Sequence, residues 1–309
     1  MTKEIRWTVP ADQTGRRLDA ILAEAFPDRS RSNHRGLILN GNIIVDGVQV
    51  KPSMKALGGE KLCIVLPDEK LVDTIAQTPL NFPILFEDEH LIVINKPSNL
   101  VAHPGAGHEE VSVVSALLSH CQLCPIGAPL RPGIIHRLDK ETSGVMVLAK
   151  TEIAHKRLVK AFSEHLVDKT YLGIAQGEFA NNRGVIKVAI ERDRQHRKRM
   201  MATRADRGKM AISHFQVKER FRAATMVEVI IETGRTHQIR VHLSYIGNPL
   251  LGDKTYQGKK WPGHPHHFLH SHRLKMLHPI SEKIMIWIAP LPDDFQAALA
   301  ELRSRSNAE

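Results

Sequence analysis

One segment of the chain combines the residue types of an acid–base or nucleophilic site. Residues 136–144 (HRLDKETSG) place one carboxylate, Asp139, between two cations and just ahead of a Thr-Ser-Gly turn. Apolar runs flank the segment at residues 133–135 and 145–149. Rigid scaffolds often present reactive groups on polar loops between buried strands. We therefore expect a loop that displays Asp139 between two strands.

A second segment supplies a cation at the edge of a helix. Residues 232–242 (ETGRTHQIRVH) follow an apolar strand, and Thr236 is suited to cap the helix N-terminus. Apolar residues at helical spacing then form one stripe: Ile239, Leu243 and Ile246. Arg240 adjoins this stripe, and a half-buried arginine needs an anion. We therefore expect a negatively charged partner beside Arg240.

The strand predicted at residues 169–175 (KTYLGIA) presents a tyrosine beside small residues. Strand alternation puts Tyr171, Gly173 and Ala175 on one face and the intervening apolar residues on the other. Tyr171 is thus expected to face a cleft. A half-buried core tyrosine is the alternative that the strand pattern by itself leaves open.

Together these segments resemble the motifs of the RluA/RluD family of pseudouridine synthases. The residues around Asp139 and Arg240 match the signatures HRLDxxTSG and GRTHQIRVH, and the strand with Tyr171 matches a third motif more loosely. The resemblance implies that Asp139 is catalytic and that Arg240 pairs with it. It also implies that Tyr171 stacks on the target base, with a role for its C5 proton, and that Arg137 holds the flipped nucleotide or takes its place.

The activity implied by this resemblance is the isomerisation of uridine to pseudouridine in RNA. The reaction breaks the C1′–N1 glycosidic bond, turns the base and joins C1′ to C5. It needs no redox change or group transfer, so we expect no cofactor. A carboxylate serves by adding covalently to the nucleoside or by removing a sugar proton to give a glycal-like intermediate, and both routes stay open. A stacked uridine must first be flipped out.

A small unit at residues 15–70 precedes the catalytic part. Its pattern predicts two helices, a hairpin and a strand: residues 18–26, 33–39, 43–50 and 61–66. This unit resembles an S4-type RNA-binding domain, which implies RNA contacts for Arg31 and Arg35; a solvated basic face is the alternative. Residues 71–81 are a predicted linker. Residues 82–309 predict an α+β domain of pseudouridine synthase type, with one mixed, mostly antiparallel sheet.

The charge balance indicates a polyanionic partner. The 309 residues carry a net charge of +10, which favours RNA before a membrane. The RNA contacts expected in the second part of the chain are His136, Arg137, Arg197, Lys198, Arg199 and Arg235. No apolar run approaches a transmembrane helix and the N-terminus does not resemble a signal peptide, so we expect a cytoplasmic protein. No self-association stripe is evident, and we expect a monomer.

Cysteines and histidines are the candidate metal ligands of the chain. Cys121 and Cys124 have the spacing of half a zinc site, but no second pair completes it, so we expect reduced thiols. Histidines also gather near the C-terminal end: His264, His266, His267, His270 and His272. They lack an HExxH spacing, and we expect them in loops facing RNA, with no metal bound.

Within the family, the S4-like unit and residues 101–107 (VAHPGAG) are most similar to the D-type branch. That branch modifies 23S rRNA of the large ribosomal subunit in the helix 69 region. The alternatives are the same chemistry on other rRNA or tRNA uridines, and a non-catalytic RNA-binding factor for the assembly of ribosomal particles. A metal-dependent hydrolase built on the histidines is a third. The trio of aspartate, tyrosine and arginine favours the enzyme, because RNA binding alone does not need it.

Overall fold

The computed structural model describes residues 3–27, 31–66, 78–104, 111–128, 131–193, 195–196 and 199–307. The chain divides into two compact units, Met1–Thr74 and Ile75–Glu309. Arg197, Lys198 and most of the predicted linker 71–81 lie outside the described residues. Among the residues that are described, no helix is both long and apolar enough to cross a membrane.

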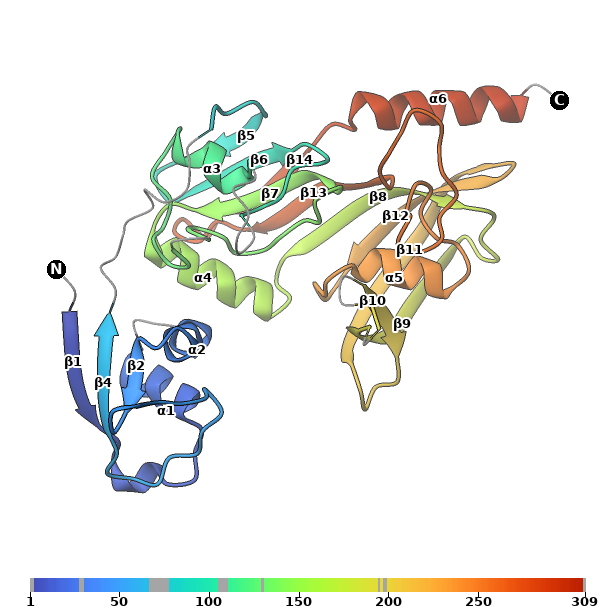
Figure 1. The fold of residues 1–309 in the computed structure, drawn as a ribbon. Coiled ribbons are helices and arrows are strands. Elements are labelled where there is room, and N and C mark those ends of the chain that lie inside the picture. The colour runs from blue at the N-terminus through green and yellow to red at the C-terminus, as the bar shows by residue number, and fades with distance from the viewer. Residues whose placement is uncertain are drawn as a thin grey trace. The chain divides into compact units, whose positions relative to one another are not determined.

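The first unit is a four-stranded antiparallel sheet with two helices (Figure 1). Its strands, in spatial order, are β1 (Lys3–Thr8), β4 (Lys61–Leu66), β2 (Ile43–Val45) and β3 (Val48–Gln49). Its helices are the 3-10 turn η1 (Ala11–Gln13), α1 (Leu18–Ala25) and α2 (Arg31–Leu39). The predicted hairpin is present, since Asp46 and Gly47 have the positive φ angles, 49° and 80°, that a type I′ turn requires. The sequence pattern does not predict β1, an edge strand.

A buried carboxylate on α1 organises the basic side of the first unit. Asp19 accepts hydrogen bonds from Arg17 Nη2 at 2.8 Å and from Arg31 Nη2 at 2.9 Å. These cations, Arg17 most strongly, lower the pKa of Asp19 to about 2. Arg31 therefore has an internal partner, although its side chain is 54% exposed. Arg35 is also exposed.

The second unit is built on one ten-stranded sheet in the order β10-β9-β11-β12-β8-β13-β7-β6-β5, with β14 paired to β13. Only the β13–β7 pair is parallel among the strands described. This confirms the predicted α+β class with a mixed, mostly antiparallel sheet. The strands are β5 (Ile84–Glu87), β6 (Leu91–Lys96), β7 (Ser143–Ala149), β8 (Asp168–Gln176), β9 (Arg183–Arg192), β10 (Met200–Thr203), β11 (Lys209–Phe221), β12 (Ala224–Ile231), β13 (Leu269–Leu277) and β14 (Ile284–Ile288).

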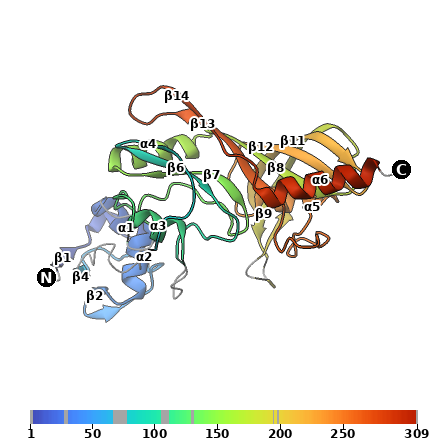
Figure 2. The same cartoon turned by 90° about the horizontal axis from the view of Figure 1, so that it is seen from above.

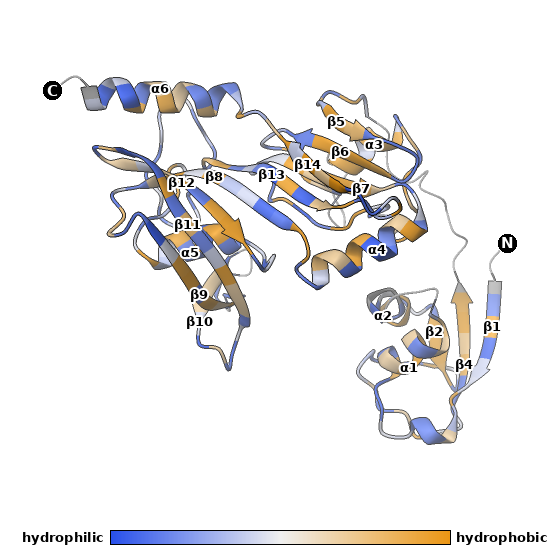
Figure 3. Ribbon diagram, turned by 180° about the vertical axis from the view of Figure 1, so that it is seen from behind, coloured by the Kyte–Doolittle hydropathy of each residue, from blue (hydrophilic) through white to orange (hydrophobic). Residues whose placement is uncertain are grey.

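Four helices cover the faces of this sheet: α3 (Val113–Leu118), α4 (Glu152–Ser163), α5 (Gln238–Tyr245) and α6 (Asp293–Asn307). Strand alternation sends Met146 and Leu148 of β7 into the core with α3 and α5, and Val145 and Val147 into the core with α4. Helices α3 and α4 accordingly lie on opposite sides of β6 and β7 (Figure 2). Strands β6 and β7 are hydrophobic along much of their length, whereas α6 alternates between hydrophobic and hydrophilic residues (Figure 3).

The segment before β7 differs from the prediction. Residues 133–135 form no strand, and only Ile134 makes a bridge, to Leu148. The reason is that β6 pairs along one edge of β7, while β13 takes the other edge at its start. Gly144 permits that approach: its φ is +110°, and a Cβ there would lie 2.2 Å from the carbonyl oxygen of Ser271.

Candidate active site

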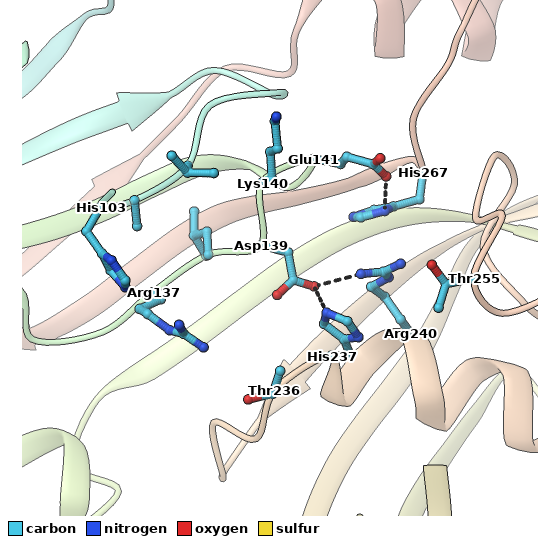
Figure 4. A pocket seen from close by; sticks show the side chains of 13 residues that line it. His103, Arg137, Asp139, Lys140, Glu141, Thr236, His237, Arg240, Thr255 and His267 are labelled. Carbon is cyan, nitrogen blue, oxygen red and sulfur yellow. Dashed lines mark hydrogen bonds and ion pairs between the residues drawn. The ribbon is translucent and has the colours of Figure 1, made fainter. Parts of the chain in front are cut away.

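A cavity of about 350 Å³ opens beside the loop that precedes β7. Three separate stretches of the second unit form its walls: the segment after β6, the loop before β7, and the start of α5 with the loop beyond it (Figure 4). The lining residues are Val101, Ala102, His103, Arg137, Leu138, Asp139, Lys140, Glu141, Thr236, His237, Arg240, Thr255 and His267. The fold thus brings together the segment that carries Asp139 and the segment that carries Arg240, two of the three that the sequence indicates as reactive.

Asp139 lies in this cavity with one carboxylate oxygen held and the other open. Its Oδ2 accepts a hydrogen bond from Arg240 Nη1 at 3.1 Å, and His237 Nε2 lies 3.9 Å from the same oxygen (Figure 4). Within the described residues, nothing donates a hydrogen bond to Oδ1. The side chain is 25% exposed. The predicted pairing of Asp139 with Arg240 is therefore present in the structure.

A second carboxylate, which the sequence analysis missed, holds Arg240 from the other side. Asp253 accepts from Arg240 Nε at 2.7 Å and from Nη2 at 2.9 Å. Both side chains are buried, 0% exposed for Asp253 and 7% for Arg240. Burial works against the charge of Arg240, but Asp253 and then Asp139 outweigh it and raise the pKa of the guanidinium. The available signal was an acidic residue directly behind an apolar run and a glycine, at residues 249–252.

The start of α5 differs from the predicted cap. The N-cap residue is His237, in the left-handed region with φ 56°, and its side chain makes no capping bond. Gln238 holds the turn instead: its Oε1 accepts from Thr233 Oγ1 and from the amide of Arg235, and its Nε2 donates to a carbonyl of β11. Both donors to Gln238 Oε1 precede α5, so this side-chain amide braces the turn before the helix rather than capping its first N–H groups. Arg235 donates through Nε to the carbonyl of Met210.

Buried polar groups anchor the loop that carries Asp139. Lys96, at the end of β6, is fully buried and donates through Nζ to the carbonyls of Pro97, Leu100 and Lys140 at 2.8, 2.8 and 3.1 Å. Burial lowers the pKa of Lys96 to about 7, against the charge of Asp139. The sequence hint was a lysine that ends the apolar run at residues 91–95.

Two histidines, one in the loop before β13 and one in β13 itself, hold the other end of the same segment. His267 Nε2 lies 2.9 Å from Thr142 Oγ1, and His267 Nδ1 lies 3.0 Å from Glu141 Oε2. The hydrogen bond with His267 lowers the pKa of Glu141 to about 2. The next histidine along, His270, lies 2.8 Å from Ser143 Oγ. His270 is thus a buried part of the fold and not a loop residue facing RNA, whereas His267, although buried, lines the cavity. His264, His266 and His272 are half-buried, and their contact with RNA stays a prediction.

Tyr171 lies behind the cavity rather than in its wall. It packs with Ala175 in the core beneath α3 and α5, whereas Leu172 and Ile174 pack on the opposite face, as the alternation predicts. The ring is 8% exposed. Burial raises the pKa of Tyr171 to about 12; the Ser271 hydroxyl lowers it and the charge of Asp139 raises it further. The Tyr171 phenol therefore interacts electrostatically with Asp139.

The remaining predicted residues fall into different surroundings. Arg137 is exposed and lines the cavity. His136 is turned inward: its Nε2 accepts from the amide of Val147, its ring stacks on Phe162 at 4.7 Å, and burial lowers its pKa to about 3. It is thus an internal acceptor and not a group presented to RNA. The guanidinium of Arg199 lies 5.6 Å from the centre of the Tyr256 ring.

The described residues were predicted to include no metal site, and their side chains can be compared with that expectation. Within them, no group of three or more histidine, cysteine or acidic side chains is placed to hold a metal ion. The three cysteines are free thiols. What the cavity does contain is a carboxylate oxygen open to a ligand and backed by a guanidinium, which is suited to act as a nucleophile or a base.

Family models match both units of the chain. The model for RNA pseudouridylate synthases matches residues 90–245, and the model for the S4 domain matches residues 16–62. Among solved structures, human RNA pseudouridylate synthase domain containing 4 has a TM-score of 0.57 at 28% identity, over 71% of this chain and 92% of that one.

Curated relatives match nearly the whole chain. Ribosomal large subunit pseudouridine synthase D of Xylella fastidiosa is 41% identical, over 97% of this chain and 92% of its own length. The protein of that name in Pseudomonas aeruginosa is also 41% identical, over 97% and 96%. The uncharacterized RNA pseudouridine synthase YlyB of Bacillus subtilis is 37% identical, over 97% and 98%. The chain therefore belongs to the RluA-type family of RNA pseudouridine synthases, which isomerise uridine in RNA, and it carries an S4 domain.

Proposed function

We propose that this enzyme converts uridines of large-subunit rRNA to pseudouridine, with Asp139 as the catalytic carboxylate. The observation that carries the assignment of Asp139 is its geometry: Oδ2 is held by Arg240, and Oδ1 has no hydrogen-bond donor among the described residues. The names of the relatives from Xylella fastidiosa and Pseudomonas aeruginosa support the rRNA substrate. The helix 69 region of 23S rRNA is the target that we favour within it.

The open oxygen of Asp139 supplies the chemistry. Either it attacks C1′ as the C1′–N1 bond breaks, giving a covalent adduct, or it removes a sugar proton to give a glycal-like intermediate. C1′ then bonds to C5 as the bond to the aspartate breaks in the first route, or as the aspartic acid returns the proton to the sugar in the second, and in both the C5 proton leaves to solvent. Arg240 fixes the orientation of the carboxylate, because a bidentate contact with Asp253 prevents the guanidinium from turning.

Tyr171 and Arg137 take different parts in holding the nucleotide. A phenol with a pKa near 12 stays protonated at neutral pH, so we do not assign the removal of the C5 proton to Tyr171. Its ring lies behind the cavity wall, and its stacking on the base stays the prediction made from the family resemblance. Arg137 is exposed at the cavity mouth and stays our candidate for holding the flipped nucleotide or filling the gap left in the RNA.

We propose that residues 15–70 bind RNA and that residues 82–309 carry the catalytic domain. Arg35 and the outer part of Arg31 offer exposed charge on the first unit, and the half-buried Arg199 and Arg235 add charge near α5. The segment that contains Arg197 and Lys198 adds charge in the sequence. Each phosphate contact contributes to the salt dependence of binding, so the affinity should fall steeply as salt rises.

The test is the release of tritium from C5-labelled uridine in large-subunit rRNA. Wild type and Asp206→Asn, an exposed carboxylate outside the cavity, should release the label, and Asp139→Asn should not. RNA binding and the unfolding transition of each variant show whether the fold is kept. Full release by Asp139→Asn would refute the role of Asp139. Release from tRNA or small-subunit rRNA alone would refute the proposed substrate and leave Asp139 in place.

A further inference from the structure

A chain of hydrogen bonds runs from the backbone of β10 through two side chains to the cavity. The amide of Met200 donates to Tyr256 Oη at 3.0 Å, and Tyr256 Oη lies 2.9 Å from His237 Nδ1. A backbone N–H can only donate, so it occupies a lone pair of the phenol. In the tautomer of a neutral His237 whose proton sits on Nε2, Nδ1 accepts the hydroxyl hydrogen of Tyr256.

The backbone at His237 indicates that its ring is needed there. A non-glycine residue with φ 56° is uncommon and strained, and such strain tends to gather at functional sites. The side chain does not use its position to cap α5. Instead the ring points at Asp139, whose Oδ2 lies 3.9 Å from Nε2 (Figure 4).

The groups around the pair keep both in the required protonation states. Burial raises the pKa of Tyr256 to about 12, so the phenol keeps its hydrogen at neutral pH. Burial also lowers the pKa of His237, whose charged or titratable neighbours are Asp139, Arg240, Asp253 and His267. The ring is therefore neutral, and only one of its nitrogens carries a hydrogen.

We propose that Tyr256 and His237 are positioning residues for Asp139, and that the Tyr256 hydroxyl selects the histidine tautomer whose Nε2–H faces Oδ2. The proposal rests on the proposed catalytic role of Asp139. Arg240 and His237 then present two donors to the same oxygen, which leaves Oδ1 as the reacting atom. The 3.9 Å separation exceeds a hydrogen bond, so the contact closes when the substrate moves either group by about 1 Å.

Tyr256→Phe is the first test, with Tyr245→Phe as the matched control. Tyr245 is 59% exposed at the end of α5 and outside the cavity. Without the hydroxyl, the other tautomer turns a lone pair towards the carboxylate. We expect the single-turnover rate of tritium release at saturating rRNA to fall about tenfold, the size of one neutral hydrogen bond, with RNA affinity unchanged. Loss of stability with an unchanged rate would overturn the proposal.

Two substitutions of His237 separate positioning from a structural role. Asparagine tolerates a positive φ better than histidine, so His237→Asn should be at least as stable as wild type, yet its short amide cannot reach Asp139. Glutamine places an amide N–H near the position of Nε2. We expect His237→Gln to react several-fold faster than His237→Asn. An asparagine variant as fast as wild type, or faster than the glutamine variant, would refute the positioning role even if Asp139→Asn is inactive.

Discussion

Replacing Asp253 by asparagine should uncouple Arg240 from its support without changing the shape of the site. In the native structure Asp253 Oδ2 accepts from Arg240 Nε at 2.7 Å. Its Oδ1 accepts from Arg240 Nη2 at 2.9 Å and from the amides of Thr255 and Tyr256 at 3.1 and 3.2 Å. An asparagine has one oxygen for these two sets of donors. If the oxygen keeps the Oδ1 side, the NH2 group faces Arg240 Nε–H, donor against donor.

The loss of stability that we expect for Asp253→Asn follows from the burial of the two side chains. The exposed fractions are 0% for Asp253 and 7% for Arg240, so water cannot replace the missing acceptor. Loss of one charge-assisted hydrogen bond costs about 1.5–3 kcal/mol, and breaking a buried pair costs about 3–5 kcal/mol in all. We therefore expect the free energy of unfolding to fall by about 3 kcal/mol, a large part of the ~5–15 kcal/mol typical of a domain.

The catalytic consequence is separate from the loss of stability. Arg240 would be free to turn with Asp139, and the orientation of the carboxylate would be lost. We expect the single-turnover rate to fall at least about tenfold, which corresponds to about 1.4 kcal/mol, at a temperature where the variant is folded. Urea unfolding and tritium release measure the two effects, with Asp206→Asn as the exposed control. A variant with native stability and native rate would refute the idea that Asp253 holds Arg240.

Three further predictions concern other buried or exposed charges. Asp19→Asn should lower the free energy of unfolding by about 2 kcal/mol at neutral pH, because Arg17 depresses the pKa of Asp19 from 3.8 to about 2. That stability is present above pH 3.8 and is lost as the pH falls towards 2, so the wild-type and variant unfolding curves should converge there; a constant gap would contradict it. Lys96→Met should lower the free energy of unfolding by about 3 kcal/mol and slow the reaction, since three carbonyls, one of them that of Lys140, lose their donor. Arg137→Ala should change stability by less than about 0.5 kcal/mol yet slow modification of a paired uridine about tenfold more than that of a single-stranded one, and equal losses would contradict a role in base flipping.

Short-range patterns account for what could be predicted. The alternation at Tyr171, the stripe that fixes α5 and the Asp46–Gly47 turn all depend on residues a few positions apart. Such periods are set by backbone geometry, so they survive into the fold. The prediction of a strand at residues 133–135 was wrong because an apolar run specifies burial but not a free sheet edge to pair with.

Two features of the site depend on hydrogen bonds that the spacing of residues along the chain does not predict. The N-cap of α5 is His237 and not Thr236, because Gln238 reaches back to Thr233 and across to β11. One of the three carbonyls that accept from Lys96 belongs to Lys140, which lies 44 positions away in a loop. Hydrogen bonds of this kind depend on the meeting of distant backbone groups, which residue spacing does not encode.

The sequence by itself determined the family, the α+β class and the residues that we propose for the chemistry, since Asp139 and Arg240 stand in motifs that match residue for residue. It also predicted that Arg240 needs an anion, because burial of an unpaired guanidinium is too costly. Only the tertiary structure decided that two carboxylates share that guanidinium and that His237 and Tyr256 stand beside them. Arg240 lies 101 positions from Asp139 and 13 from Asp253, and only the folded sheet brings all three within hydrogen-bond distance.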